Sequence, residues 1–149
     1  MSDRRSVYLP NFRNDEGACA CGCKMTPGDE IMTAVQAFCS ILARKLGRRI
    51  QCRITSGARC KAHDAAVQAA VARAGGTPST DSQHTHGTAI DATFWAFDRD
   101  WQQIDNSTVA AVAQSCGLFG GVGHKYYVRQ RLNLVHLDVR HAGGTVATW

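Results

Sequence analysis

The sequence of 149 residues has no apolar run near the roughly 20 residues that a membrane-spanning helix needs, so no such helix is expected. Its opening stretch, MSDRRSVYLPNF, carries basic residues without an apolar segment, and we expect no secretory signal peptide. Internal repeats and low-complexity tracts are also missing. With 44% apolar and 19% charged residues, the composition predicts one globular domain over 1–149, with a cysteine-bearing segment at 1–25.

Aromatic residues are scarce, at 7% of the chain, and the 17 lysines and arginines form no continuous stripe. Nucleic-acid binding uses clustered cations and stacking rings, so we expect no nucleic-acid partner. We also expect no membrane partner. The net charge of +5 instead favours weak attraction to an anionic surface such as a bacterial cell wall.

Paired C-x-x-C hooks, which are typical of zinc knuckles, are missing although the chain has seven cysteines. Three of these alternate as Cys19, Cys21 and Cys23 in the stretch CACGC. Three interpretations remain open. The cluster binds a structural metal, forms a disulfide with Cys52 or Cys60, or consists of free thiols.

Hydrophobic periodicity and end signals predict three helices, at 26–49, 62–74 and 106–116. The first would have Thr26 as its N-cap and Pro27 in its first turn. The third would be capped by Asn106 or Ser107 and would stop at Gly117. Strands are expected at 50–57, 88–95 and 132–140, and a bent, glycine-rich strand with a turn at 117–127. This order is typical of an α+β fold with helices packed on a small antiparallel sheet.

The last predicted strand alternates apolar with ionisable residues. Its core face would carry Val135, Leu137 and Val139, and its opposite face would carry His136, Asp138 and Arg140. Two interpretations of the second face are open: a solvent-exposed ladder of charges, or part of a functional site.

The stretch SQHTHGTAID provides a possible partner for that face. Asp91 would lie on a strand between small residues, and His84 precedes it with six residues between them, including Gly87 at a possible turn. With His136 from a neighbouring strand, two nitrogens and one oxygen would surround one point. Catalytic zinc sites use such ligands and leave a fourth position for water, so the chemistry indicated is hydrolysis.

Four motifs carry a family resemblance. Along the chain they are ACACGC, ITSGAR, SQHTHGTAID and VHLDVR, and the third of them fits the pattern Ser-x-His-x-x-Gly-x-Ala-x-Asp. Together they resemble the zinc D-alanyl-D-alanine carboxypeptidase and L-alanyl-D-glutamate endopeptidase family. These peptidoglycan peptidases share the hedgehog-type fold, and the cysteine-bearing start is similar to their phage-like branch. The similarity runs from about residue 12 to 140.

The resemblance implies roles for particular residues. His84, Asp91 and His136 would hold one catalytic Zn²⁺. Arg59 would act in catalysis by binding a carboxylate or carbonyl oxygen of the substrate through its fork of donors, and Ser82 would help to bind the substrate.

One position departs from the family pattern. Several members have an acidic general base three residues before the last histidine, where this chain has Asn133. Asp138 could be the catalytic base instead, or it could orient His136; His124 is another candidate, and an efficient base could be lacking. His86 falls at a variable position of the pattern and is expected to be a loop residue.

The expected function is zinc-dependent hydrolysis of bacterial peptidoglycan stem peptides by a phage endolysin or a virion-associated cell-wall peptidase. Such a protein would pass from the host cytoplasm to the wall through a separate pore, or act on a virion beside tail proteins. Two alternatives are kept. One is a catalytically silent zinc-binding module of the same fold, used for wall binding or virion assembly. The other is a redox or metal-sensing domain built on the cysteines.

Overall fold

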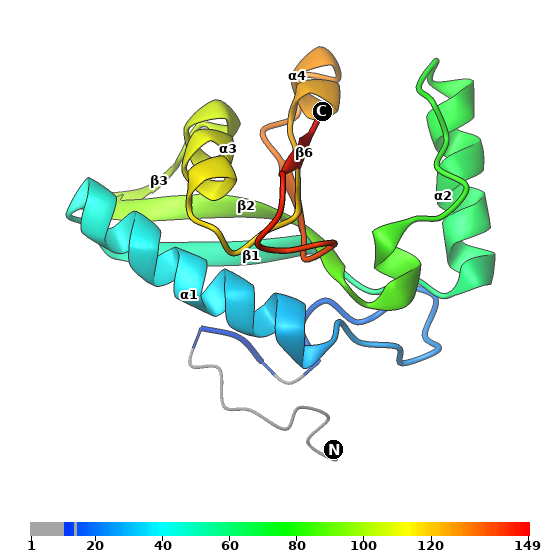
Figure 1. The fold of residues 1–149 in the computed structure, drawn as a ribbon, viewed down its shortest axis with the longest axis horizontal. Coiled ribbons are helices and arrows are strands. Elements are labelled where there is room, and N and C mark those ends of the chain that lie inside the picture. Colours follow the sequence, from blue (N-terminus) through cyan, green and yellow to red (C-terminus); the bar gives the residue numbers. More distant parts are fainter. Residues whose placement is uncertain (1–10, 14) are drawn as a thin grey trace.

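A computed structural model describes residues 11–13 and 15–149, and within them the fold is α+β, as expected (Figure 1). The remainder of the predicted N-terminal segment, residues 1–10 and 14, lies outside the described residues. The helices are α1 (Asp29–Leu46), α2 (Lys61–Arg73), the 3-10 helix η1 (Gln83–His86), α3 (Asn106–Ser115) and α4 (Lys125–Arg129). The strands are β1 (Ile50–Ser56), β2 (Ala89–Asp98), β3 (Asp100–Gln103), β4 (Gly121–Gly123), β5 (Val135–Asp138) and β6 (Ala147–Thr148).

The six described strands form one sheet in the order β1-β2-β5-β4-β6, with β3 paired to β2. The sheet is mixed rather than purely antiparallel, because β6 runs parallel to β4 while the other pairs are antiparallel. The sequence did not predict β3 or β6. Strands of four and two residues are too short to show a clear period of two.

The hydrophobic core lies between the sheet and the helices α1 and α3, which contact each other and the sheet (Figure 1). Phe38 of α1 is at its centre. The Phe38 ring meets the rings of Phe94 and Phe119 edge to face, at 5.4 Å between centroids in both cases. Phe94 lies on β2 and Phe119 lies just before β4. One side chain of α1 therefore packs against residues from two separate strand regions of the sheet.

The predicted cap of the first helix is wrong. The helix begins at Asp29, its N-cap is Gly28, and Pro27 lies before the first turn. The backbone N–H of Gly28 donates to the carbonyl of Gly87, 2.8 Å away, so a tertiary contact rather than the Thr26 side chain sets the start of the helix.

The predicted caps of the third helix are also wrong. Asp105 is the N-cap, and its carboxylate accepts a hydrogen bond from the backbone N–H of Ser107. Asn106 is the first residue of the helix, and its side-chain amide donates to the carbonyls of Leu132 and Leu134. The helix ends before Gly117, as predicted, where φ is +78°.

Two segments predicted as strand differ in the structure. The glycine-rich stretch contributes only three residues of strand, and the following residues Lys125–Arg129 form α4. The last long strand is only Val135–Asp138, because the three preceding residues accept hydrogen bonds from Asn106 at the start of α3 and from Gln103 of β3. Among the described residues, no helix combines the length and apolar character required to cross a membrane.

Phe38→Ala tests the position of the core. We expect a loss of about 3–5 kcal/mol in the free energy of unfolding, measured by urea denaturation, because the cavity cannot close between the two flanking rings. Leu46→Ala is the matched control at the partly exposed end of the same helix, and it is expected to cost less than about 1 kcal/mol. Equal losses in the two variants would contradict this assignment of the core.

Candidate metal centre

Three side chains from separate elements meet at one point. His84 lies in η1, Asp91 on β2 and His136 on β5, and the last two are direct cross-strand neighbours. Nε2 of His84 is 3.3 Å from Oδ2 of Asp91, and Nδ1 of His136 is 2.9 Å from Oδ1 of Asp91. All three side chains are buried and offer ligand atoms within 4.8 Å of one another. The group could therefore hold a metal ion.

Each histidine has one ring nitrogen held by an oxygen outside this group. Nδ1 of His84 donates to the carbonyl of Gly57 at 2.6 Å, which leaves Nε2 toward Asp91. Nε2 of His136 donates to Oδ2 of Asp138 at 2.8 Å, which leaves Nδ1 toward Asp91. Metal-binding histidines are commonly oriented in this way by an acceptor on the second nitrogen.

Asp138 is fully buried beside His136, and of the three ionisable side chains on this face only Arg140 is partly exposed, so the face is not a solvent-exposed ladder of charges. Arg140 donates to the Asp138 carboxylate from Nη2 at 2.6 Å and from Nε at 2.9 Å. On the other side is Gly121, where a Cβ atom would overlap the same carboxylate. Because the carboxylate is enclosed in this way, the structure favours an orienting role for Asp138 on His136 rather than a role as general base.

The charges at this point shift one another's pKa. Burial alone would raise the pKa of Asp91, but the charge of His84 and the hydrogen bond from His136 outweigh it and hold that pKa well below its usual range. Burial would lower the pKa of His136, yet hydrogen bonds to Asp138 and Asp91 raise it to about 9. In the metal-free protein His136 is therefore protonated at neutral pH, and a metal ion would displace that proton.

Arg59 lies in the loop between β1 and α2 and is buried next to the three possible ligands. Its Nη1 donates to Oδ1 of Asp64 on α2 at 2.9 Å, and its Nη2 is 3.6 Å from Oδ2 of Asp91. Its Nε is buried without a hydrogen-bond partner among the described residues. The guanidinium is thus held at the centre and keeps a donor that is not in use.

Ser82 and His86 lie on either side of His84 in the chain, and Ser82 also lines the groove that the three possible ligands share. Ser82 is buried at the start of η1, where its hydroxyl accepts a hydrogen bond from the backbone N–H of His84 at 3.3 Å. His86 is exposed and pairs with Asp81 at 2.6 Å, as expected for a loop residue.

Asn133, at the position where the family has its base, and His124, the other candidate base, lie elsewhere. Asn133 accepts a hydrogen bond from the backbone N–H of Asn106 at 2.6 Å and donates to the carbonyl of Ile104, so it supports the start of α3. His124 precedes α4 and is not among the residues that line the groove described next.

The three possible ligands and Arg59 line a groove of about 920 Å³. Its walls include residues of α2 and α4, which stand apart in Figure 1. Sequence reasoning missed Tyr126, Tyr127 and Trp149 in this lining, because α4 was predicted as strand and the chain end was left unassigned. Two adjacent tyrosines in a chain poor in aromatics were the available signal. Burial, and then the charge of Asp91, raise the pKa of Tyr127, so its hydroxyl stays protonated.

A second group that could hold a metal ion consists of Cys19, Cys21, Cys23 and Cys60. All seven cysteines lie in the described part of the chain and are free thiols, so the disulfide interpretation is not what the structure shows. Cys52 is instead buried in the core beside Cys39.

Comparisons of the chain with protein-family models, with curated proteins and with solved structures found no match.

Asp138→Asn tests the role of this carboxylate. An amide in place of the carboxylate would orient the His136 ring less firmly and would make it less basic. We therefore expect zinc affinity to fall about 10–100-fold, measured by competition with a chromophoric chelator. Asp81→Asn, on an exposed carboxylate, is the control and should leave the affinity unchanged. An Asp138→Asn protein that folds and binds zinc as tightly as the wild type would contradict the orienting role.

Proposed function

We propose that this chain is a zinc-dependent peptidase that hydrolyses peptide bonds in the stem peptides of bacterial peptidoglycan. The observation that carries the proposal is the convergence of His84, Asp91 and His136, with Arg59 beside them, in one groove. These residues come from three of the four motifs that resemble the zinc D-alanyl-D-alanine carboxypeptidase and L-alanyl-D-glutamate endopeptidase family. The α+β architecture is compatible with the hedgehog-type fold that this likeness implies.

The donor set fits zinc. Two imidazole nitrogens and one carboxylate oxygen are typical of catalytic zinc sites, in which water occupies the fourth position. Bound there, zinc would lower the pKa of that water and polarise a peptide carbonyl. The chain itself fixes the ring orientations of His84 and His136 through Gly57 and Asp138.

The groove also offers donors for a substrate oxygen. Arg59 is held by Asp64 and lines the groove with its Nη2 3.6 Å from Asp91, so its guanidinium suits a carboxylate or carbonyl oxygen of a peptide. The protonated hydroxyl of Tyr127 lines the same groove and can donate to the same group. Both donors lie close to Asp91, so a peptide bound to them would have its carbonyl near the ion.

The likeness to the phage-like branch favours an endolysin, or a virion-associated peptidase that acts beside tail proteins. The net charge of +5 supports this setting, because bacterial walls are anionic.

The second candidate function is a catalytically silent zinc-binding module of the same fold. It is favoured by the lack of a free carboxylate that could act as general base in the groove. Among the described lining residues, the carboxylates are Asp81 and Asp91 alone. Asp91 is a proposed ligand, and Asp81 is exposed and paired with His86. Asp138, enclosed by Arg140, has no free access to a water on the ion.

Mass analysis of muropeptides after digestion of peptidoglycan tests activity and the choice of bond together. We expect new cleavage products with the zinc-loaded protein, loss of those products on chelation, and recovery when zinc is returned. His84→Ala should behave like the chelated protein. His86→Ala, two residues away and exposed, is the matched control and should keep full activity.

A folded His84→Ala protein with undiminished cleavage would contradict the proposed mechanism. Stoichiometric zinc with no cleavage of any wall preparation would contradict the peptidase and support the silent module.

A further inference from the structure

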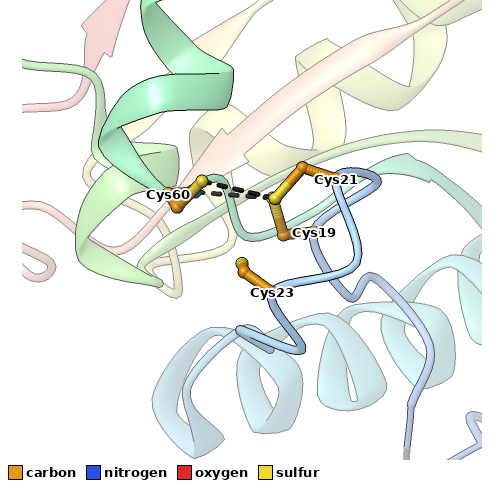
Figure 2. A group of neighbouring side chains, drawn as sticks. All are labelled: Cys19, Cys21, Cys23 and Cys60. Atoms are coloured by element: carbon orange, nitrogen blue, oxygen red, sulfur yellow. Dashed lines mark hydrogen bonds between the residues drawn. The ribbon is translucent and has the colours of Figure 1, made fainter.

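Three cysteines of one short stretch and a fourth that is distant in the sequence gather beside the groove. Cys19, Cys21 and Cys23 lie on one loop, and Cys60 faces them from the residue before α2 (Figure 2). The Sγ atom of Cys21 is 3.3 Å from that of Cys19 and 3.4 Å from that of Cys60, and the Cys19 and Cys60 sulfurs are 4.0 Å apart.

We propose that these four thiolates bind a second zinc ion, which is structural. With Zn–S bonds of about 2.3 Å, the sulfurs of a tetrahedral site lie roughly 3.8 Å apart. The three measured spacings are close to this value, and the sulfur of Cys23 lies within 4.8 Å of the others. Four sulfur ligands complete the tetrahedron and leave no position for water or substrate, as in structural zinc sites.

Hydrophobic packing does not explain the cluster. Free cysteines are usually buried as small apolar residues, as Cys39 and Cys52 are in this core. Cys21 and Cys23, in contrast, are exposed, and Cys60 is only partly buried. A metal ion bound by all four sulfurs would explain why these thiols converge near the surface without forming a disulfide.

The surroundings favour the thiolate form that binds metals. The backbone N–H of Cys60 donates to the sulfur of Cys19 at 3.5 Å, and Nδ1 of His63 lies 3.3 Å from the same sulfur. Cys60 is also the N-cap residue of the 13-residue helix α2, where the partial positive charge of the helix end favours an anion.

The proposed ion would clamp the N-terminal segment onto the loop that supports the groove. The backbone N–H of Ala58 donates to the carbonyl of Gly17 at 2.9 Å, and a Cβ atom on Gly57 would overlap Gly17. The carbonyl of Gly57 holds His84, and Arg59 directly precedes Cys60. The second zinc would thus stabilise the loop that orients one ligand of the first ion.

Zinc content of the protein purified under reducing conditions tests this inference and does not require peptidase activity. We expect two zinc ions per chain in the wild type and one in the double variant Cys21→Ser/Cys23→Ser. Cys116→Ser, on a partly buried thiol outside the cluster, is the control and should keep two. His63→Ala should also keep two, since it only adjoins the ligands.

Replacement by Co²⁺ in the His84→Ala protein, with all cysteines intact, covers the case in which the cysteine variants fail to fold. We expect the intense thiolate-to-cobalt charge transfer and the tetrahedral d–d bands of a four-sulfur site. Absence of those bands, unchanged zinc content in the double cysteine variant, loss of the ion in His63→Ala, or disulfides in the purified protein would each overturn the inference.

Discussion

The antiparallel pairing of β2 with β5 is the constraint on which the site depends. In this register Asp91 faces His136 and, on the opposite side of the sheet, Ile90 is paired with Leu137. Ile90 and Leu137 are fully buried in the core, so a slip of one residue would expose them and bury the polar pair on the wrong side. The hydrophobic core therefore fixes the register, and the register places two of the three possible ligands beside each other.

The same face of the sheet buries several charges, and it can do so because each has a partner. Asp91 lies between His84, His136 and Arg59, while Asp138 lies between His136 and Arg140. A charge buried in such a position without a partner would reduce the free energy of unfolding by several kcal/mol. Removal of one partner from a buried ion pair has an effect of about this size. The network also leaves one nitrogen of each histidine directed at the same carboxylate, so a divalent ion would replace a proton rather than require a new arrangement of side chains.

Much of this could be predicted from the sequence, for reasons tied to particular residues. The α+β class and the three long helices follow from apolar periodicity, and His84, Asp91 and His136 follow from their motifs and from strand alternation. The predicted caps of α1 and α3 were wrong because Gly28 and Asn106 make hydrogen bonds to residues distant in the sequence, which local patterns do not reveal. The short elements β3, β6 and α4 carry too little periodicity, and with α4 the role of Tyr127 was missed. Cys60 was considered only as one of two disulfide partners for the N-terminal cysteines, because no local pattern distinguishes it from Cys52.

The proposed function depends above all on the binding of one zinc ion in the groove by His84, Asp91 and His136. The most direct test is anomalous diffraction at the zinc edge from crystals of the protein grown with zinc. We predict a peak within bonding distance of Nε2 of His84, Nδ1 of His136 and a carboxylate oxygen of Asp91, with Nε2 of His136 still hydrogen-bonded to Asp138. A map with no peak at these atoms, in crystals where the three side chains are ordered, would contradict it.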